Sequence, residues 1–309
     1  MQSSASPAAP GRPREIEAWT NLHLVHPVSR IVVDRLLTTP VTPNQVSLAS
    51  VVCAAGAAAC YLSLAWPWAA FAGLACQFAW HVLDGADGDL ARRSGRASPL
   101  GELIDGVCDH LSQVLIYVAF VYILQRHGWG SWSSWGIASI AGACHFFQAN
   151  VYETGRKTYR RWVYGADWMR QTVTAPAGQR GLQRALASLY MAVSNLANPG
   201  EARIEAAMGP VLTAGAASAA RARGLYRKLY APLVKASGLL DSNTRTIAAF
   251  TSILAGSPLW FFLFEIAVQT AALIWLGRER RRRDDQLIAQ LGASAQAASA
   301  PNWSLASRA

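Results

Sequence analysis

The residues best suited to chemistry are four aspartates in two neighbouring apolar segments: Asp84, Asp87, Asp105 and Asp109. A carboxylate within an apolar membrane segment costs roughly 2.5–3.5 kcal/mol on insertion scales, so such a residue marks a function by default. The first two are three residues apart and the last two are four apart. Both spacings place a pair on one face of a helix. We therefore expect the four carboxylates to converge if the two segments pack as neighbouring helices.

Carboxylates in such proximity repel one another and take up protons unless a cation compensates their charge. Mg²⁺ and Mn²⁺ prefer carboxylate oxygens, and Mg²⁺ usually keeps some ligand positions for water and substrate phosphates. Two ions flanking a phosphoryl group would stabilise both the attacking and the leaving oxygen. The pattern predicts a site for two Mg²⁺ or Mn²⁺ ions. Asp89 lies on another side of the helix and is interpreted as a surface charge.

The residues between the aspartates complete the pattern D-x2-D-G-x2-A-R-x8-G-x3-D-x3-D. Gly85, Gly88 and Gly101 have no Cβ, so a substrate or a second helix can approach the backbone closely. Arg92 can pair bidentately with a phosphate. A single aspartate near a membrane face could be a helix cap, but four at these spacings beside Gly88 and Arg92 fit a pyrophosphate-linked substrate better.

The segments that must position these residues are membrane helices. The chain has 309 residues, of which 52% are hydrophobic and 15% charged, and its apolar blocks have the length that crosses a bilayer as a helix. We predict an all-α, polytopic membrane helical bundle with about six transmembrane helices. The expected spans are residues 45–64, 67–90, 101–124, 131–151, 243–256 and 258–277.

The regions outside the spans complete the expected domain organisation. Residues 1–13 are expected to be disordered, and residues 14–40 to hold an N-terminal interfacial amphipathic helix. The six-span domain covers 41–278, with 152–242 as a cytoplasmic insertion whose helices lie on the leaflet rather than forming a separate folded domain. Residues 279–309 are predicted to form a basic and then disordered tail.

Positive charge predicts the orientation in the membrane. Lys and Arg follow the second, fourth and sixth spans, whereas the other connections are short and carry little charge. By the positive-inside rule, both termini and the acidic site face the cytoplasm. The net charge of +10 is therefore interpreted as a topology signal rather than as a nucleic-acid surface. We find no pattern of a secretory signal peptide, and the cysteines are interpreted as packing residues.

The aspartate pattern resembles the signature of the CDP-alcohol phosphotransferase (CDP-alcohol phosphatidyltransferase) family, whose members are integral membrane phospholipid synthases. The sequence Thr42-Pro43-Asn44-Gln45-Val46-Ser47, which leads into the first span, is also similar to that family. The resemblance covers residues 30–150 well and the last two spans loosely.

The resemblance implies transfer of a substituted phosphate from a CDP-linked lipid donor to a polar alcohol, with release of CMP. It implies metal ligands at Asp84, Asp87, Asp105 and Asp109, and Asp109 as the proton acceptor. Contacts to the CDP part of the donor are implied for a second set of residues: Asn44, Ser47, Gly88, Ala91, Arg92, Ser98 and Gly101. It further implies a homodimer in the bilayer.

Several alternatives stay open. The acceptor alcohol is not readable, although Arg245 and Arg156 are candidates to bind it. CDP-diacylglycerol is preferred as the donor, but a CDP-linked headgroup transferred to diacylglycerol remains possible. An Asp-rich intramembrane prenyltransferase and a cation transporter are the competing classes, and His81 and His110 could be partners of the aspartates.

Overall fold

The computed structural model describes residues 13–165 and 200–299, which form helices and connecting turns without a strand. The chain divides into two compact units. We call the first the aspartate unit; it comprises Glu17–Phe146 and Gly238–Ala271. We call the second the aromatic unit; its described residues are 13–16, 147–165, 200–237 and 272–299. The predicted all-α class is confirmed for the described residues.

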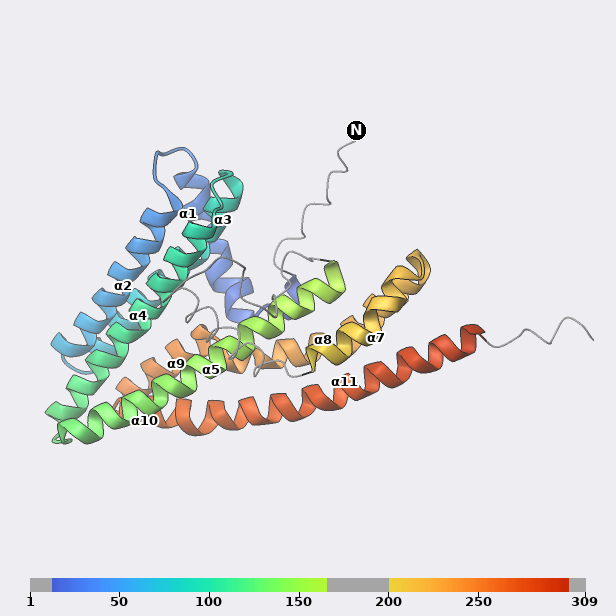
Figure 1. The fold of residues 1–309 in the computed structure, drawn as a ribbon. Coiled ribbons are helices and arrows are strands. Elements are labelled where there is room, and N and C mark those ends of the chain that lie inside the picture. The colour runs from blue at the N-terminus through green and yellow to red at the C-terminus, as the bar shows by residue number, and fades with distance from the viewer. Residues whose placement is uncertain (1–12, 166–199, 300–309) are drawn as a thin grey trace, which may run out of the picture. The chain divides into compact units, whose positions relative to one another are not determined.

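The aspartate unit is built mainly from long helices (Figure 1). These are α1 (His26–Leu36), α2 (Pro43–Ser63), α3 (Trp68–Arg93), α4 (Pro99–Arg126), the first part of α5 (Ser131–Tyr164), α9 (Ser242–Leu254) and α10 (Leu259–Leu263). A π-helical turn, Phe264–Gln269, leads into α11 (Thr270–Ser299). Helices α2, α3 and α4 pack against one another, as convergence of the aspartates requires.

Two local signals fix where the motif helices begin. At α2 the Thr42 hydroxyl accepts a hydrogen bond from the Gln45 backbone, while the Gln45 side chain accepts one from the Thr42 backbone. This capping box satisfies two N–H groups at the helix start, and Pro43 needs no partner at the first position. At α4 the Ser98 hydroxyl accepts from Gly101 N at 3.0 Å. Asp105 and Asp109 therefore lie about two and three turns from the capped start of this helix.

Small residues allow close helix packing in the aspartate unit. A Cβ at Gly73 of α3 would lie 2.1 Å from the Tyr61 ring of α2, so only glycine fits there. The Tyr61 hydroxyl donates to Gln77 Oε1 at 2.7 Å, which satisfies a polar group inside the core. Phe120 of α4 and Phe261 and Phe262 of α10 complete the same buried cluster.

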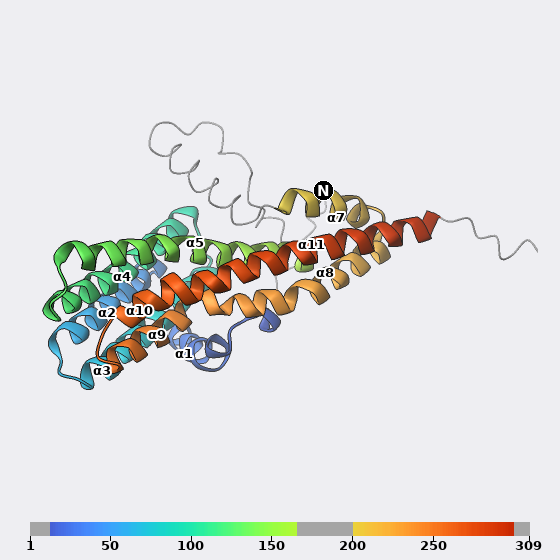
Figure 2. The same cartoon turned by 90° about the horizontal axis from the view of Figure 1, so that it is seen from below.

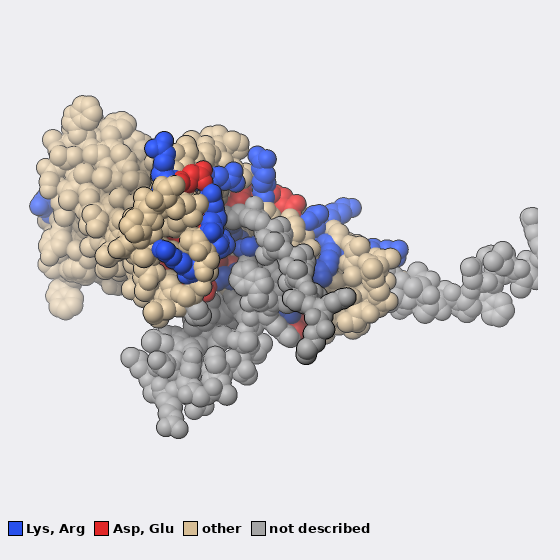
Figure 3. Space-filling model, turned by 90° about the horizontal axis from the view of Figure 1, so that it is seen from above, with Lys and Arg blue, Asp and Glu red and all other residues tan. Residues whose placement is uncertain are grey.

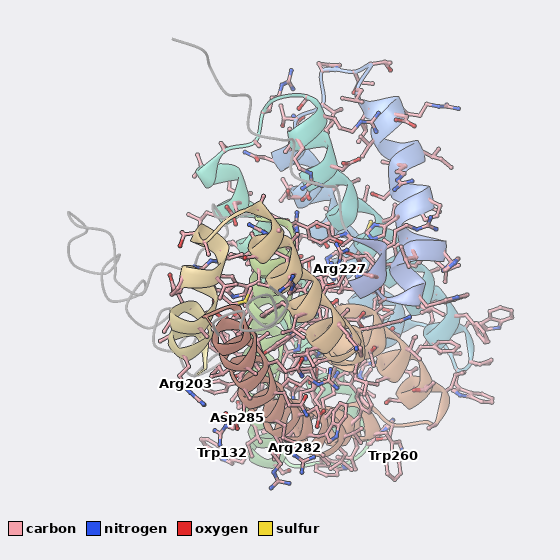
Figure 4. The ribbon with its side chains drawn as sticks, turned by 90° about the vertical axis from the view of Figure 1, so that its right-hand side faces the viewer. Trp132, Arg203, Arg227, Trp260, Arg282 and Asp285 are labelled. Atoms are coloured by element: carbon pink, nitrogen blue, oxygen red, sulfur yellow. The ribbon has the colours of Figure 1, made fainter. Side chains whose placement is uncertain are left out.

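Among residues 13–165 and 200–299, three helical stretches are long and apolar enough to cross a membrane: Pro43–Ser63, Leu100–Arg126 and Leu259–Ala293. They correspond to the first, third and sixth predicted spans. Helices α3, α5 and α9 lie where the other three were predicted, but six spans are not confirmed. Large apolar side chains are exposed on several helices, including Trp132 and Trp260 (Figure 4). Figure 3 shows a broad surface area without acidic or basic side chains.

The amphipathic helix predicted within residues 14–40 differs from the observed segment. A short 3-10 turn covers Arg14–Ile16, and a π-helical turn, Asn21–Val25, precedes α1. Pro27 explains the π-helical turn, because proline lacks an N–H and its ring clashes with the carbonyl four residues earlier. The His26 N–H instead bonds to Asn21 O, five residues back. An interfacial position of this segment is not confirmed.

The aromatic unit was not expected to have its own core. It contains α7 (Glu201–Thr213), α8 (Ala216–Ala236) and parts of α5 and α11 (Figure 2). Its buried side chains include Tyr159, Trp162, Ile204, Met208, Tyr226 and Tyr230. The Tyr226 and Tyr230 rings stack with centroids 4.1 Å apart. A separate folded domain was not predicted for 152–242, and its described part contributes buried side chains to this unit. Residues 166–199 lie outside the described residues.

The predicted disordered tail also differs. Helix α11 continues to Ser299, which agrees with the high helix propensity of its Ala, Gln and Leu residues. The buried side chains of Leu287 and Leu291 give this part of the helix an apolar contact face. Residues 300–309, and residues 1–12 of the predicted disordered N-terminus, lie outside the described residues.

Candidate metal and nucleotide site

Three of the four aspartates converge in the aspartate unit. Helix α3 presents Asp84, and α4 presents Asp105 and Asp109. One carboxylate oxygen from each lies within 4.8 Å of the others, and all three side chains are partly buried. The helical spacing explains this geometry, because Asp105 and Asp109 share one face of α4 and that face meets Asp84.

Asp87 occupies a more enclosed position than the other three. Its side chain is buried, and Asp87 Oδ2 accepts a hydrogen bond from Ser47 Oγ of α2 at 2.5 Å. Asp87 also interacts electrostatically with Asp105. The fourth aspartate is therefore anchored to α2 and coupled to the triad of Asp84, Asp105 and Asp109.

Ser47 was predicted to contact the nucleotide, and its hydroxyl is found bonded to Asp87, a contact that was not predicted. Ser47 and Asp87 are far apart in the chain, and a serine in the second turn of a helix carries no signal for a carboxylate partner. The pairing depends on how α2 packs on α3, so only the structure reveals Ser47 as a group that orients Asp87.

The donor set fits a hard divalent cation. Three carboxylate oxygens that lie within 4.8 Å of one another repel strongly, and a divalent cation offsets that repulsion. Carboxylate oxygen is the ligand type that Mg²⁺ and Mn²⁺ prefer. Asp84, Asp105 and Asp109 are placed to hold one ion, and Asp87 is the remaining carboxylate for a second.

Three of the residues predicted to contact the CDP-linked donor lie close together where α2 and α4 begin. The Ser98 hydroxyl and the Asn44 side-chain oxygen lie 3.2 and 3.6 Å from a Cβ built at Gly101. Gly101 thus provides a close approach to the backbone beside two polar side chains. Asn44 and Ser98 are both exposed, so a ligand can reach them.

Three other residues predicted to contact the CDP-linked donor lie at the end of α3. Gly88 and Ala91 are partly buried, and Arg92 is exposed. The Arg92 guanidinium lies 3.6 Å from Asp89, a weak surface contact. The neighbouring Arg93 is held more firmly, by Asp34 of α1 at 2.6 Å. Asp89 is thus a partly exposed partner of both arginines, in line with its interpretation as a surface charge.

The two acceptor candidates are placed very differently. Arg245 is buried in the aspartate unit, where it pairs with Glu265 at 3.1 Å and donates to Leu240 O. Glu265 also accepts from Tyr117 and contacts His145. Arg156 lies in the aromatic unit and donates to the Tyr152 hydroxyl at 2.6 Å. Arg245 could reach an acceptor only by exchanging its contact with Glu265.

The hydrogen bonds of His81 and His110 in the described part of the chain do not involve the triad. His81 is buried and shares a hydrogen bond of 2.7 Å with the Thr246 hydroxyl. His110 Nδ1 donates to Gly106 O of its own helix. These contacts indicate that both residues are packing or surface histidines rather than partners of the aspartates.

The sequence model of the CDP-alcohol phosphatidyltransferase family matches residues 40–197. This is slightly more than half of the 309 residues and includes every residue of the aspartate pattern. The chain belongs to the CDP-alcohol phosphatidyltransferase family. The match confirms the family resemblance, and nothing in the described site favours the prenyltransferase or the transporter.

One similar curated protein carries the same family name. It is an uncharacterized CDP-alcohol phosphatidyltransferase class-I family protein 2 from Dictyostelium discoideum, 41% identical over 58 residues. The aligned part covers 19% of this chain and 14% of that protein, so most of the relative has no counterpart in the alignment. No solved structure shows significant similarity to this chain.

Proposed function

We propose that this protein transfers a substituted phosphate from a CDP-linked donor to an alcohol and releases CMP. The observation that carries the proposal is the convergence of Asp84, Asp105 and Asp109 within 4.8 Å in a chain of the CDP-alcohol phosphatidyltransferase family. The preferred donor is CDP-diacylglycerol and the preferred acceptor a polar alcohol. The enzyme is proposed to act as a homodimer with its site and both termini on the cytoplasmic side.

The proposed reaction is a direct displacement. The acceptor hydroxyl oxygen attacks the phosphorus that carries the lipid, a new P–O bond forms, and the bond to the CMP oxygen breaks. The hydroxyl proton passes to the Asp109 carboxylate, and CMP leaves with the bonding electrons. A general base in this position supplies about 10²–10⁴-fold of the rate.

The remaining residues bind and orient the donor. Asn44, Ser98 and Gly101 receive the nucleotide where the backbone is accessible, and Arg92 pairs with a phosphate. Ser47 keeps Asp87 in position through its hydroxyl. A divalent cation held by the aspartates neutralises the pyrophosphate when bound. Arg245 and Arg156 remain the proposed acceptor contacts.

The proposal is tested by CMP release from purified full-length protein in mixed micelles containing Mg²⁺ or Mn²⁺. CDP-diacylglycerol is offered with glycerol phosphate, serine, inositol or inositol phosphate. Asp109→Asn removes the proposed base with little change in shape. Asp285→Asn is the matched control, because Asp285 is exposed and forms an ion pair with the similarly exposed Arg203 (Figure 4).

We expect CMP release that depends on one acceptor, vanishes in Asp109→Asn and persists in Asp285→Asn. CMP release only with a CDP-linked headgroup and diacylglycerol would reverse the donor assignment while keeping the reaction class. No release with either donor type, or equal release by Asp109→Asn, would contradict the proposal. A covalent phosphorylated enzyme would contradict the direct displacement.

A further inference from the structure

The aromatic unit contains a cavity of about 280 Å³ that the aspartate chemistry does not use. It is lined mainly by three helices: α5 contributes Phe147, Val151 and Gly155, α8 contributes four residues (Tyr226, Tyr230, Leu233 and Val234), and α11 contributes six (Leu273, Leu276, Gly277, Arg280, Arg281 and Asp284). None of the four motif aspartates lines it. Its size is near the lower limit of about 300–1,000 Å³ for small-molecule sites.

The cavity lining is amphipathic. Leu273 and Leu276 lie on α11 just before Arg280 and Arg281, so the apolar and the cationic parts follow one another along the helix. Further apolar lining comes from Phe147, Val151, Leu233 and Val234. An apolar part followed by two guanidinium groups fits a molecule that has a hydrocarbon chain and an anionic group.

Arg280 carries a buried donor that no residue in the described part of the chain satisfies. Its Nε atom has no hydrogen-bond partner among the described residues, and its side chain is only 15% exposed. The nearest carboxylate, on Glu201, is 3.9 Å from the Nη2 atom, which is too long for a strong charged hydrogen bond. An unsatisfied buried donor costs about 1–3 kcal/mol, so its persistence calls for a ligand or another explanation.

The one carboxylate in the lining is already engaged. Asp284 is buried and accepts a hydrogen bond from the Tyr230 hydroxyl, and Tyr230 in turn stacks on Tyr226. With two arginines against one carboxylate, the lining has a positive balance. Arginine is also the side chain best suited to bind a phosphate through a planar pair of donors.

The position of the cavity along α11 indicates the source of the anion. The stretch Leu259–Ala293 is long and apolar enough to span a membrane, and its arginine run begins at Arg278 and continues through Arg280–Arg283. Arginines that end an apolar stretch lie at the level of lipid headgroups. Basic pockets between helices at this level bind anionic headgroups.

We propose that this cavity binds an anionic phospholipid, with the phosphate at Arg280 and Arg281 and the start of one acyl chain between α5, α8 and α11. The cavity holds a headgroup phosphate and part of a chain, while the rest of the lipid extends outside. This site does not depend on the proposed catalytic function, because its ligands and its residues are separate from the aspartate pattern.

Two glycines permit a test that leaves the surrounding structure intact. Gly155 and Gly277 both line the cavity, and a Cβ built at either meets no atom within 4 Å. Leucine at either position would therefore fill the cavity. Gly224 of α8 is the matched control, since its Cβ also meets no atom within 4 Å but it does not line the cavity.

The experiment uses full-length protein in detergent micelles and a phosphatidic acid that carries a photoactivatable diazirine on one acyl chain. Crosslinked peptides are located and quantified by mass spectrometry. We expect crosslinks to peptides that contain the lining residues. Gly155→Leu and Gly277→Leu should each reduce them by at least about tenfold, while Gly224→Leu leaves them unchanged.

Charge variants test the anionic part. Arg280→Gln should weaken binding by about tenfold, the typical effect of losing one hydrogen bond to a charged group. Arg282→Gln is the control, because Arg282 is 77% exposed and does not line the cavity (Figure 4). Diacylglycerol with the same diazirine should crosslink poorly.

Three results would overturn the proposal. Unchanged crosslinking in both cavity-filling variants would place the lipid elsewhere on the protein. Equal crosslinking of diacylglycerol, together with no effect of Arg280→Gln, would rule out recognition of the anion. Full displacement of the lipid by millimolar inorganic phosphate would assign the cavity to a free anion. Each readout is independent of CMP release, so a failure here does not bear on the proposed reaction.

Discussion

The aspartate unit and the aromatic unit use charged residues in opposite ways. In the aspartate unit, Asp84, Asp105 and Asp109 bring like charges within 4.8 Å of one another. In the aromatic unit, opposite charges are paired: Arg161 contacts Glu201 at 3.0 Å and Glu205 at 3.1 Å. Repelling groups held together are costly for folding and useful for binding a cation, whereas paired groups stabilise the fold. The contrast distinguishes the proposed metal ligands from paired residues that stabilise the fold.

Hydrogen bonds to carboxylates show the same contrast. Ser47 orients Asp87, which lies beside the triad. Tyr159 and Tyr164 both donate to Glu15, at 2.5 and 2.8 Å, and Arg227 lies 3.3 Å from it. The first contact supports a candidate site, while the second joins the N-terminal turn to α5 and α8. Substitutions in the two units should therefore change different measured quantities.

The largest expected effect comes from removing a triad carboxylate. Asp105→Asn should lower CMP release by at least about 100-fold, because loss of a metal ligand should exceed the roughly 10–100-fold cost of losing an outer partner. Thermal unfolding should shift little, or upward, since like-charge repulsion is reduced. CMP-release kinetics and a melting curve of the same sample measure both effects. CMP release by Asp105→Asn close to that of the wild type would contradict a catalytic use of the clustered aspartates.

A smaller loss is expected when Ser47 is changed. Ser47→Ala removes the hydroxyl that donates to Asp87 and should reduce CMP release by about tenfold, within the range for outer partners of metal ligands. Ser50→Ala is the matched control, because the Ser50 hydroxyl donates to the Ser47 backbone carbonyl rather than to a carboxylate. Equal rates for the two variants would show that Ser47 does not act through Asp87.

In the aromatic unit the expected effect is on stability. Arg161 is only 9% exposed, lies between two glutamates and stacks over Trp162 with its guanidinium carbon 4.3 Å from the ring centroid. Arg161→Gln should lower the free energy of unfolding by about 1–2 kcal/mol, since Glu201 and Glu205 remain partly solvated. Arg203→Gln, at an exposed pair with Asp285 (Figure 4), should change it by less than about 0.5 kcal/mol. Both values are measured by fluorescence-monitored unfolding in micelles. Equal losses of stability in Arg161→Gln and Arg203→Gln would contradict a stabilising role for the Arg161 ion pairs.

The smallest effect concerns pH. Burial alone would raise the pKa of Glu15, but hydrogen bonds from Tyr159 and Tyr164 and the charge of Arg227 outweigh it, so the pKa is lowered from 4.5. Stability from this carboxylate is therefore present above pH 4.5 and is lost as the pH falls through the lower folded-state pKa. In Glu15→Gln the free energy of unfolding should fall less steeply below about pH 5 than in the wild type, with a difference of less than about 1 kcal/mol. An equally steep fall of the unfolding free energy with pH in Glu15→Gln and the wild type would exclude this contribution of Glu15.

The sequence predicted the aspartate unit better than the aromatic unit. The spacing of the aspartates and the start of α2 at Thr42 could be read directly, because both are set by local helix geometry. The link between Ser47 and Asp87 could not, since it depends on how α2 and α3 pack. Nor could the ion pair of Arg245 with Glu265, which joins α9 to the π-helical turn before α11.

The aromatic unit escaped prediction for a different reason. Its core relies on tyrosines, a tryptophan and paired charges such as Arg161 with Glu201, rather than on long apolar stripes. In a linear sequence these residues are read as polar, basic helices on a membrane surface. Their burial depends on how α5, the neighbouring helices α7 and α8, and α11 pack, and α5 and α11 are far apart in the chain.

The claim that the triad is a cation site is tested most directly by Mn²⁺ binding, followed by electron paramagnetic resonance of the free ion. Full-length wild type, Asp105→Asn and the control Asp285→Asn are titrated in the same micelles. We expect saturable Mn²⁺ binding by the wild type and by Asp285→Asn, and a loss of at least about tenfold in affinity for Asp105→Asn. Equal Mn²⁺ affinity in all three proteins would contradict the assignment of the triad as the metal site.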